Sequence, residues 1–363
     1  MAPVSWSDDL PEGLLQMILR QPTDVVSLYH YRDVCRSWRS VVDKLLQSSP
    51  PAPHLLVYEK RIDNTIERVR LLNIFTGDSS ICEIPEFKTG DGQPLLPTSV
   101  YSCHGWLLMD CTACMNHAHD ICLYNPFSRA RIQLPPFIFD HSLDTREIKL
   151  VLSAKQTQPS SIALAIRQGQ CLHEKFMFWK PGDEEWTPID NSCKKRMWVG
   201  DIISFKGGFC AIDFYGNVTQ FELSPVPRAT KIPTRNKNGE TLLFGYLVES
   251  LSGDLLMVRK ALSFQVCKLD WERMEWDEIT SLGDEAIFLA RNESVCIRAG
   301  ESTVYRPNCI YFTDDAVALD IFKDSRRKEK FGVYDMANKT LHRFPYYFPC
   351  HVSLRHRWFA MHL

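Results

Sequence analysis

Two short stretches, ICEIP at residues 81–85 and RIQLP at residues 131–135, carry the pattern that decides the fold. Each is typical of a strand that ends on an aliphatic residue just before a proline, which cannot donate to a strand ladder. Similar strand ends recur at residues 186–189 (WTPI), 230–233 (TKIP), 276–279 (WDEI) and 342–345 (HRFP). Counted from Ile84 to Phe344, the final apolar residues are separated by 50, 55, 43, 47 and 65 positions.

A recurrence of this size, with several strands in each interval, predicts a β-propeller. We expect a mainly β protein of about six blades, with a seventh possible if the long last interval contains one. A pair of β-sandwiches is the structural alternative, but it would not explain the recurrence. Apolar runs between Gly, Pro, Asn and Asp residues predict the strands 54–59, 106–111, 121–125, 209–214, 218–223, 255–259, 264–269, 310–313 and 331–335.

The stretch before the repeats, from Leu10 to Leu46, has helical rather than strand periodicity. Pro11 suits the first turn of a helix, Pro22 ends that helix, and apolar residues continue at helical spacing to Leu45, which predicts three short helices. A unit of roughly 40 residues rarely buries this much apolar surface alone, so we interpret the surplus as a docking face. A DNA-binding helix-turn-helix is the rival interpretation, but residues 8–46 hold five basic and six acidic side chains, without the basic footprint that phosphate binding needs.

Three prolines in residues 50–53 predict a short, stiff spacer between the helices and the strands. We therefore predict a helical module at residues 6–47, a Pro-rich linker at 48–53 and a propeller at 54–363.

The helical module resembles the F-box, through Leu10-Pro11, the apolar spacing that follows, and the segment VCRSWR at residues 34–39. F-box proteins are substrate receptors of cullin–RING ubiquitin ligases, and their F-box binds a Skp-type adaptor. The resemblance implies that the adaptor-binding residues are Leu10, Pro11, Leu14, Ile18, Leu28, Val34, Cys35 and Trp38. Internal packing of the helices is an equally good interpretation for Cys35 and Trp38. Tyr31 departs from the aliphatic residue that many F-boxes carry there.

The rest of the chain resembles the plant F-box proteins that carry a C-terminal KIB-type β-propeller. The resemblance rests on six segments taken in order: 105–108 (GWLL), 123–127 (LYNPF), 178–186 (FWKPGDEEW), 213–217 (DFYGN), 268–271 (KLDW) and 281–284 (SLGD). It implies a substrate-recognition subunit of a Skp–cullin–F-box ubiquitin ligase, which contacts the cullin and RING subunits through the adaptor and binds an unknown protein target on the propeller.

The alternative is a propeller with its own small-ligand or carbohydrate site, or its own catalysis, and with the helices as a stabilising cap. We expect no enzyme, because the sequence holds no nucleophile elbow, phosphate-binding loop, dinucleotide fingerprint or HExxH motif.

Composition fits an intracellular protein. A net charge of −2 argues against bulk electrostatic binding to nucleic acid or a membrane surface, and thirteen irregularly spaced cysteines are typical of reduced thiols. The first ten residues, MAPVSWSDDL, have neither the basic nor the apolar region of a secretory signal. We expect the protein in the cytoplasm, the nucleus or both, with no cofactor.

Four further groups of residues invite a functional interpretation beside a structural one. Cys111, Cys114, His117 and His119 have ligand-like spacing for zinc, but an incidental hairpin loop is the favoured interpretation, and no metal is predicted. The acidic runs 183–185 and 314–315 are interpreted as solvated turns, and the basic run 326–330 as a solvated loop or an import patch. Trp179, Trp186, Trp271 and Trp276 are expected to pack between repeats rather than to form a binding platform.

Overall fold

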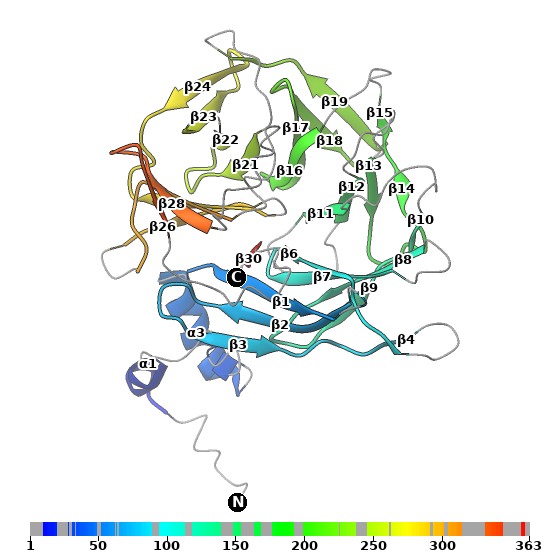
Figure 1. Cartoon of the computed structure of the whole chain (residues 1–363), viewed down its shortest axis with the longest axis vertical. Helices are drawn as coiled ribbons and strands as arrows, with labels where there is room; N and C mark the ends of the chain where they lie inside the picture. Colours follow the sequence, from blue (N-terminus) through cyan, green and yellow to red (C-terminus); the bar gives the residue numbers. More distant parts are fainter. Residues whose placement is uncertain are drawn as a thin grey trace, which may run out of the picture.

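The computed structural model describes residues 10–19, 28, 31–32, 34–48, 52–61, 63, 65–88, 94–112, 118–138, 148–153, 163–167, 176–191, 199–224, 226–236, 245–260, 263–290, 293–300, 304–313, 331–343 and 357–359. Within them the strands form six sheets of four or five strands each, arranged around a ring (Figure 1). The prediction of a mainly β, six-bladed propeller is therefore confirmed. One small extra sheet pairs β4 (Phe87–Lys88) with β5 (Pro94–Leu95) between the first two blades.

The first blade is closed by strands from both ends of the chain. Strand β30 pairs with β1 through three residues, with Leu55 opposite Trp358. The blade consists of β3 (Ser79–Cys82), β2 (Ile66–Leu72), β1 (His54–Lys60) and β30 (Arg357–Phe359). The ring therefore depends on a short C-terminal strand for its closure (Figure 1).

The next two blades follow the chain in order, each as an antiparallel sheet. Blade 2 consists of β6 (Ser99–Cys103), β7 (Trp106–Thr112), β8 (Ala118–Tyr124), β9 (Arg131–Gln133) and β10 (Phe137–Ile138). Blade 3 consists of β11 (Ile148–Leu152), β12 (Ala163–Arg167), β13 (Phe176–Trp179) and β14 (Thr187–Pro188).

Blades 4 and 5 each carry a short parallel strand on the outer edge, which covers backbone groups that an open edge would expose. Blade 4 consists of β16 (Val199–Phe205), β17 (Gly208–Asp213), β18 (Val218–Glu222), β19 (Arg228–Ile232) and the covering strand β15 (Asp190–Asn191). Blade 5 consists of β21 (Tyr246–Glu249), β22 (Leu255–Lys260), β23 (Phe264–Asp270), β24 (Glu275–Ile279) and the covering strand β20 (Arg235–Asn236).

Blade 6 contains an inserted strand. Strand β25 lies between β26 and β27 and runs parallel to β27, so the parallel pair lies inside this blade rather than at its outer edge as in blades 4 and 5. The blade consists of β26 (Val295–Arg298), β25 (Glu285–Leu289), β27 (Cys309–Thr313), β28 (Phe331–Asp335) and β29 (Thr340–Arg343). The long last interval of the sequence repeat therefore contains an extra strand rather than a seventh blade.

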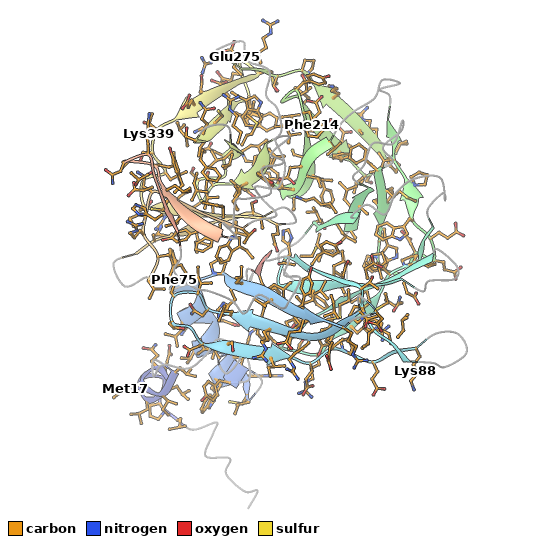
Figure 2. The ribbon with its side chains drawn as sticks, in the orientation of Figure 1. Met17, Phe75, Lys88, Phe214, Glu275 and Lys339 are labelled. Carbon is orange, nitrogen blue, oxygen red and sulfur yellow. The ribbon has the colours of Figure 1, made fainter. Side chains whose placement is uncertain are left out.

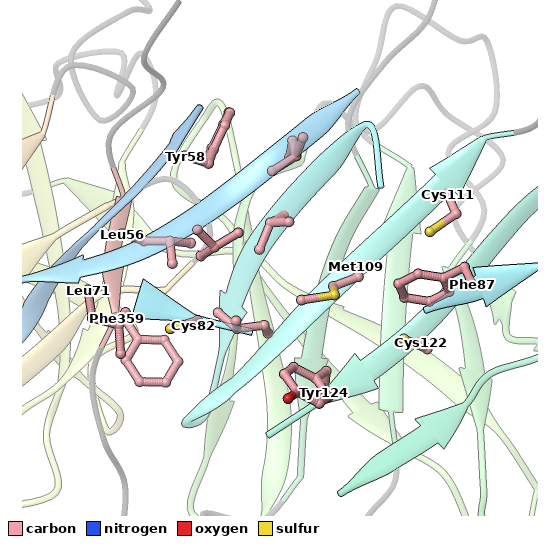
Figure 3. Close-up of a cluster of buried hydrophobic side chains, with 14 of the residues drawn as sticks. Leu56, Tyr58, Leu71, Cys82, Phe87, Met109, Cys111, Cys122, Tyr124 and Phe359 are labelled. Atoms are coloured by element: carbon pink, nitrogen blue, oxygen red, sulfur yellow. The ribbon is translucent and has the colours of Figure 1, made fainter. Parts of the chain in front are cut away.

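The core consists of apolar clusters between adjacent blades. Consecutive residues of one strand enter different clusters: Trp358 packs between blades 6 and 1, and Phe359 packs between blades 1 and 2. In the second of these clusters Leu56 and Leu71 from blade 1 join Met109 from blade 2 (Figure 3). The two faces of each sheet are thus both buried, which explains why many strands are apolar throughout rather than alternating.

One five-residue turn recurs before the outer strands of blades 1, 2, 5 and 6. Its first residue, Asn73, Asn125, Asp270 or Asp335, accepts hydrogen bonds from the backbone N–H groups two and three residues later, at 2.9–3.3 Å. The fifth residue has positive φ in every case: Gly77 (82°), Arg129 (57°), Met274 (54°) and Lys339 (53°). The turn thus uses a conformation that favours glycine, but only blade 1 has glycine there.

This turn yields a stability prediction. Lys339→Gly is expected to raise the free energy of unfolding by about 0.5–1 kcal/mol, because a left-handed conformation strains a residue that has a Cβ atom. Lys339→Ala is the matched control and should give no such gain, since alanine keeps the Cβ atom. Denaturant titration checks both variants, and equal stability of the two would contradict the strain argument.

Two helices are described in full before the ring, α1 (Glu12–Leu19) and α3 (Arg36–Ser48). Of the second predicted helix, Leu28 is helical, and Val25 and Val26 lie outside the described residues. Tyr31 and Arg32, where a bend is expected before the third helix, are helical instead. The helices lie beside blade 1, which β30 completes, and Met17 of α1 marks their position (Figures 1 and 2). No helix among the described residues is long and apolar enough to cross a bilayer.

Candidate docking surface on the N-terminal helices

The two helices share a small apolar core. Leu15 and Leu19 of α1 and Trp38, Val41 and Val42 of α3 are all less than 8% exposed. The partly buried residues Leu10, Leu28, Tyr31, Cys35 and Leu45 pack against this core. The rings of Tyr31 and Trp38 lie 5.6 Å apart, so Tyr31 stabilises the module as an aromatic partner of the tryptophan.

Local sequence fixes the position of α1. The carbonyl of Pro11 accepts hydrogen bonds from the N–H groups of Leu14 (2.9 Å) and Leu15 (3.1 Å), so the helix begins directly after the proline. Lys44 of α3 donates to the carboxylate of Glu12 at 2.8 Å and is the main cause that lowers the pKa of Glu12. This ion pair is exposed, so it orients the two helices more than it stabilises them.

The outer side of the helices is apolar and exposed. Leu14 is 48% exposed, Met17 67%, Ile18 42% and Val34 50%. Because Leu15 and Leu19 already fill the contact with α3, these outer residues have no place in the internal core of the module. We name Leu14, Met17, Ile18 and Val34 the outer apolar surface. Leu14, Met17 and Ile18 share one face of α1 by their spacing. Exposed apolar side chains on so small a module are typical of a protein interface.

The eight residues assigned from the F-box resemblance therefore divide into three groups. Leu14, Ile18 and Val34 lie on the outer apolar surface, and Pro11 is exposed beside it. Leu10, Leu28 and Cys35 are half-buried against the core, where they could contribute to both core and surface. Trp38 is 7% exposed inside the core, which favours internal packing as its role. The sequence assignment missed Met17, although its spacing of three residues from Leu14 places it on the same helix face.

The propeller holds one trio that resembles catalytic residues by type. The Ser102 hydroxyl donates to the Glu293 carboxylate at 2.7 Å, and His104 Nδ1 lies 3.5 Å from the same carboxylate. A nucleophilic serine must donate its hydroxyl proton in a hydrogen bond to a general base and must be accessible to a substrate. Ser102 instead donates to the carboxylate and is completely buried, so this arrangement is not that of a nucleophile and its base.

The tryptophans pack between blades, as the sequence interpretation expects. Trp179, Trp186 and Trp276 are each at most 7% exposed. The indole N–H of Trp186 donates to the carbonyl of Pro135 at 2.9 Å, and that of Trp276 donates to the carbonyl of Gly216 at 2.9 Å, so each joins two blades. Trp271 is half-buried and stacks on Phe205 at 6.0 Å.

The acidic run 183–185 lies in an exposed turn, where the carboxylate of Asp183 accepts the N–H of Lys180 at 3.0 Å. This is the solvated-turn role that the sequence favours. The second acidic run, 314–315, and the basic run 326–330 lie outside the described residues.

The zinc candidates are only partly described. Cys111 is fully buried, and burial raises its pKa well above the ordinary range of a thiol. Cys114 and His117 lie outside the described residues, as does the side chain of His119. Among the groups that the structure places, no three His, Cys, Asp or Glu residues are arranged to hold a metal ion.

Fold and surface together define a class: a six-bladed β-propeller preceded by a helical module with an exposed apolar face. The profile of the KIB1-4 β-propeller family matches residues 83–335, and the chain belongs to this family. Together with plant relatives that are named F-box proteins, this match confirms the resemblance to plant F-box proteins with a KIB-type propeller.

Known proteins show how far this similarity extends. The F-box protein At2g26160 of Arabidopsis thaliana is 25% identical over 353 residues, which cover 85% of this chain and 96% of the relative. The F-box/kelch-repeat protein KIB1 of the same plant is 26% identical over 227 residues, covering 58% of this chain and 53% of KIB1. Among solved structures, TolB from Acinetobacter baumannii aligns with a TM-score of 0.46 at 8% identity, over 89% of this chain and 72% of TolB.

Proposed function

We propose that this protein is the target-recognition subunit of a Skp–cullin–F-box ubiquitin ligase. In this proposal the helices bind a Skp-type adaptor, which connects the chain to the cullin and RING subunits. The propeller binds the protein that is to be ubiquitinated. Relatives that align with most of this chain are named F-box proteins, and these names support the assignment.

The outer apolar surface is the observation that carries the proposal. Leu14, Met17, Ile18 and Val34 remain 42–67% exposed although the module has a closed core of its own. Covering exposed aliphatic side chains with a partner favours binding by roughly 25 cal/mol per Å² of apolar area buried. A helical cap that only stabilised the propeller would instead turn this surface towards the ring.

The same proposal assigns catalysis to the partners. The chain would act by holding a target near the ubiquitin-conjugating enzyme, which raises the local concentration of the target lysines. The burial of Ser102 and its hydrogen bond to the Glu293 carboxylate support a non-catalytic role for this trio.

We further propose that the protein resides in the cytoplasm, the nucleus or both. Cys82 and Cys210 are among the free thiols of the described residues. Burial raises the pKa of Cys82 and of Cys210 to about 12, so these thiols stay protonated and unreactive at neutral pH. Free, inert thiols of this kind are typical of a reducing compartment.

Adaptor capture tests the proposal. The double variant Leu14→Ala and Ile18→Ala should no longer be captured by a Skp-type adaptor of the protein's own host. Truncating an interface anchor typically costs at least about 2 kcal/mol of binding free energy for each residue. Alanine favours the helix and both side chains are exposed, so the melting temperature should change little. Binding of the purified chains is measured by titration calorimetry.

A matched control uses the same chemistry elsewhere. Ile81 is 59% exposed on β3 of the propeller, and Ile81→Ala should leave capture unchanged. Full capture by the double variant would reject the residue assignment. Failure of the unmodified chain to bind any Skp-type adaptor of its host would reject the ligase proposal itself.

A further inference from the structure

Glu293 lies in the short connection between β25 and β26 of blade 6, and its side chain is only 8% exposed. A buried carboxylate is costly unless hydrogen bonds compensate for the loss of water. The partners of this carboxylate therefore indicate why it is kept inside the ring.

Both carboxylate oxygens are bound by blade 2. One oxygen accepts the hydroxyl of Ser102 at 2.7 Å, and the other accepts the backbone N–H of His104 at 2.9 Å. The turn between β6 and β7 makes the second bond possible, since His104 (φ 47°) and Gly105 (φ 76°) adopt a tight left-handed conformation there. The imidazole Nδ1 of His104 lies 3.5 Å from the same oxygen that accepts the His104 N–H.

Blades 6 and 2 are not neighbours in the ring. Blade 1 lies between them, and its inner strand is β30, which pairs with β1 through only three residues. Glu293 therefore reaches past the one blade that is assembled from both ends of the chain. By contrast, the hydroxyl of Ser204 in blade 4 donates to the carbonyl of Ser153, which directly follows the neighbouring blade 3, at 3.3 Å.

We propose that Glu293 is a latch that holds the ring closed across its seam. The hydrogen bonds from Ser102 and His104 fix blades 6 and 2 at the spacing that blade 1 requires, so the short strand β30 docks into a gap of preset width. Closure thus has two separate parts, the pairing of β30 with β1 and the carboxylate bridge. Charge-assisted bonds suit this task, because they are about twice as strong as neutral ones and need fixed geometry.

Native-state hydrogen exchange of the full chain tests the latch. Glu293→Gln keeps the shape but removes the charge, and it should speed exchange of the β1 and β30 amides about tenfold by local opening. Amides of blades 3, 4 and 5 should keep their rates. Ser102→Ala, which removes one of the two bonds, should speed exchange of the same amides by a smaller factor.

Glu285→Gln is the matched control. Glu285 also lies in blade 6 and its carboxylate accepts the N–H of Leu251 at 3.4 Å and the thiol of Cys296 at 2.8 Å, but Leu251 belongs to the neighbouring blade 5. This change should leave exchange in β1 and β30 unaltered. Equal acceleration in all six blades, or unchanged exchange in β1 and β30, after Glu293→Gln would overturn the latch. If Glu293→Gln does not fold, Ser102→Ala decides by the same two criteria.

Discussion

Trp358→Ala is expected to lower the free energy of unfolding by about 3–5 kcal/mol, the cost typical of removing a buried aromatic side chain from a core. Trp358 is 1% exposed and packs edge-on against Phe288 with ring centroids 5.0 Å apart. It also lies on β30, so the change weakens the strand that completes the first blade. Denaturant titration followed by far-ultraviolet circular dichroism measures the loss.

Two controls separate this role from the general cost of losing a tryptophan. Trp271→Ala removes a half-buried ring that stacks on Phe205. It should lower the free energy of unfolding clearly less than Trp358→Ala does. Trp358→Phe should also be mild, because the indole N–H of Trp358 has no hydrogen-bond partner among the described residues. If Trp358→Ala cost no more than Trp271→Ala, β30 would not carry the closure of the ring.

Lys149→Met is the second change with a large expected effect. Lys149 and Asp201 form an ion pair in which both side chains are at most 3% exposed. Asp201 also accepts the backbone N–H groups of Ile202 (2.8 Å) and Leu247 (2.7 Å), so this carboxylate joins the inner strands of blades 3, 4 and 5. Removing the lysine leaves a buried, uncompensated charge, which typically costs about 3–5 kcal/mol.

The pH dependence of that variant provides an internal check. Burial raises the pKa of Asp201, and the charge of Lys149 opposes this shift. Without Lys149 the folded pKa should rise further above the unfolded value, so the folded variant binds a proton more readily than the unfolded chain. Its stability deficit should therefore shrink as pH falls from 8 towards 5. A deficit that grows on acidification would contradict the assignment, and adding Asp201→Asn should restore part of the stability at pH 8.

The outer strands were the part of the fold most visible in the sequence. Ile232 ends β19, whereas Ile84 and Leu134 lie two residues and one residue beyond the ends of β3 and β9. Each stands beside a proline, and this local signal repeats because every blade must stop its outer strand before the chain crosses to the next. The blade count follows from that repeat. The inserted strand β25 has no counterpart among the described residues of the other blades, so its presence lengthened one interval without a recognisable pattern.

Contacts between distant parts of the chain could not be predicted in this way. Glu293 and His104 are 189 positions apart, and no periodicity relates them. Likewise β30 is three residues long, too short for a strand pattern, although it carries two of the most buried side chains, Trp358 and Phe359.

For the docking surface, helical spacing identified which residues are apolar but not which of two faces each occupies. Leu14 and Leu15 are adjacent and identical in type, yet they are 48% and 1% exposed. Only the position of α3 decides between them. For the same reason the sequence leaves Trp38 equally open to adaptor binding and to internal packing, because a large aromatic suits either an interface or a core.

The pairing of β1 with β30 also has a consequence for biosynthesis. Translation proceeds at roughly 5–20 residues per second, so on the order of tens of seconds separate the emergence of β1 from that of its last partner strand. During that time the nascent propeller is an open arc with a free inner edge on its first sheet. The N-terminal helices have already left the ribosome, so the adaptor proposed above would have the opportunity to bind before the ring is closed.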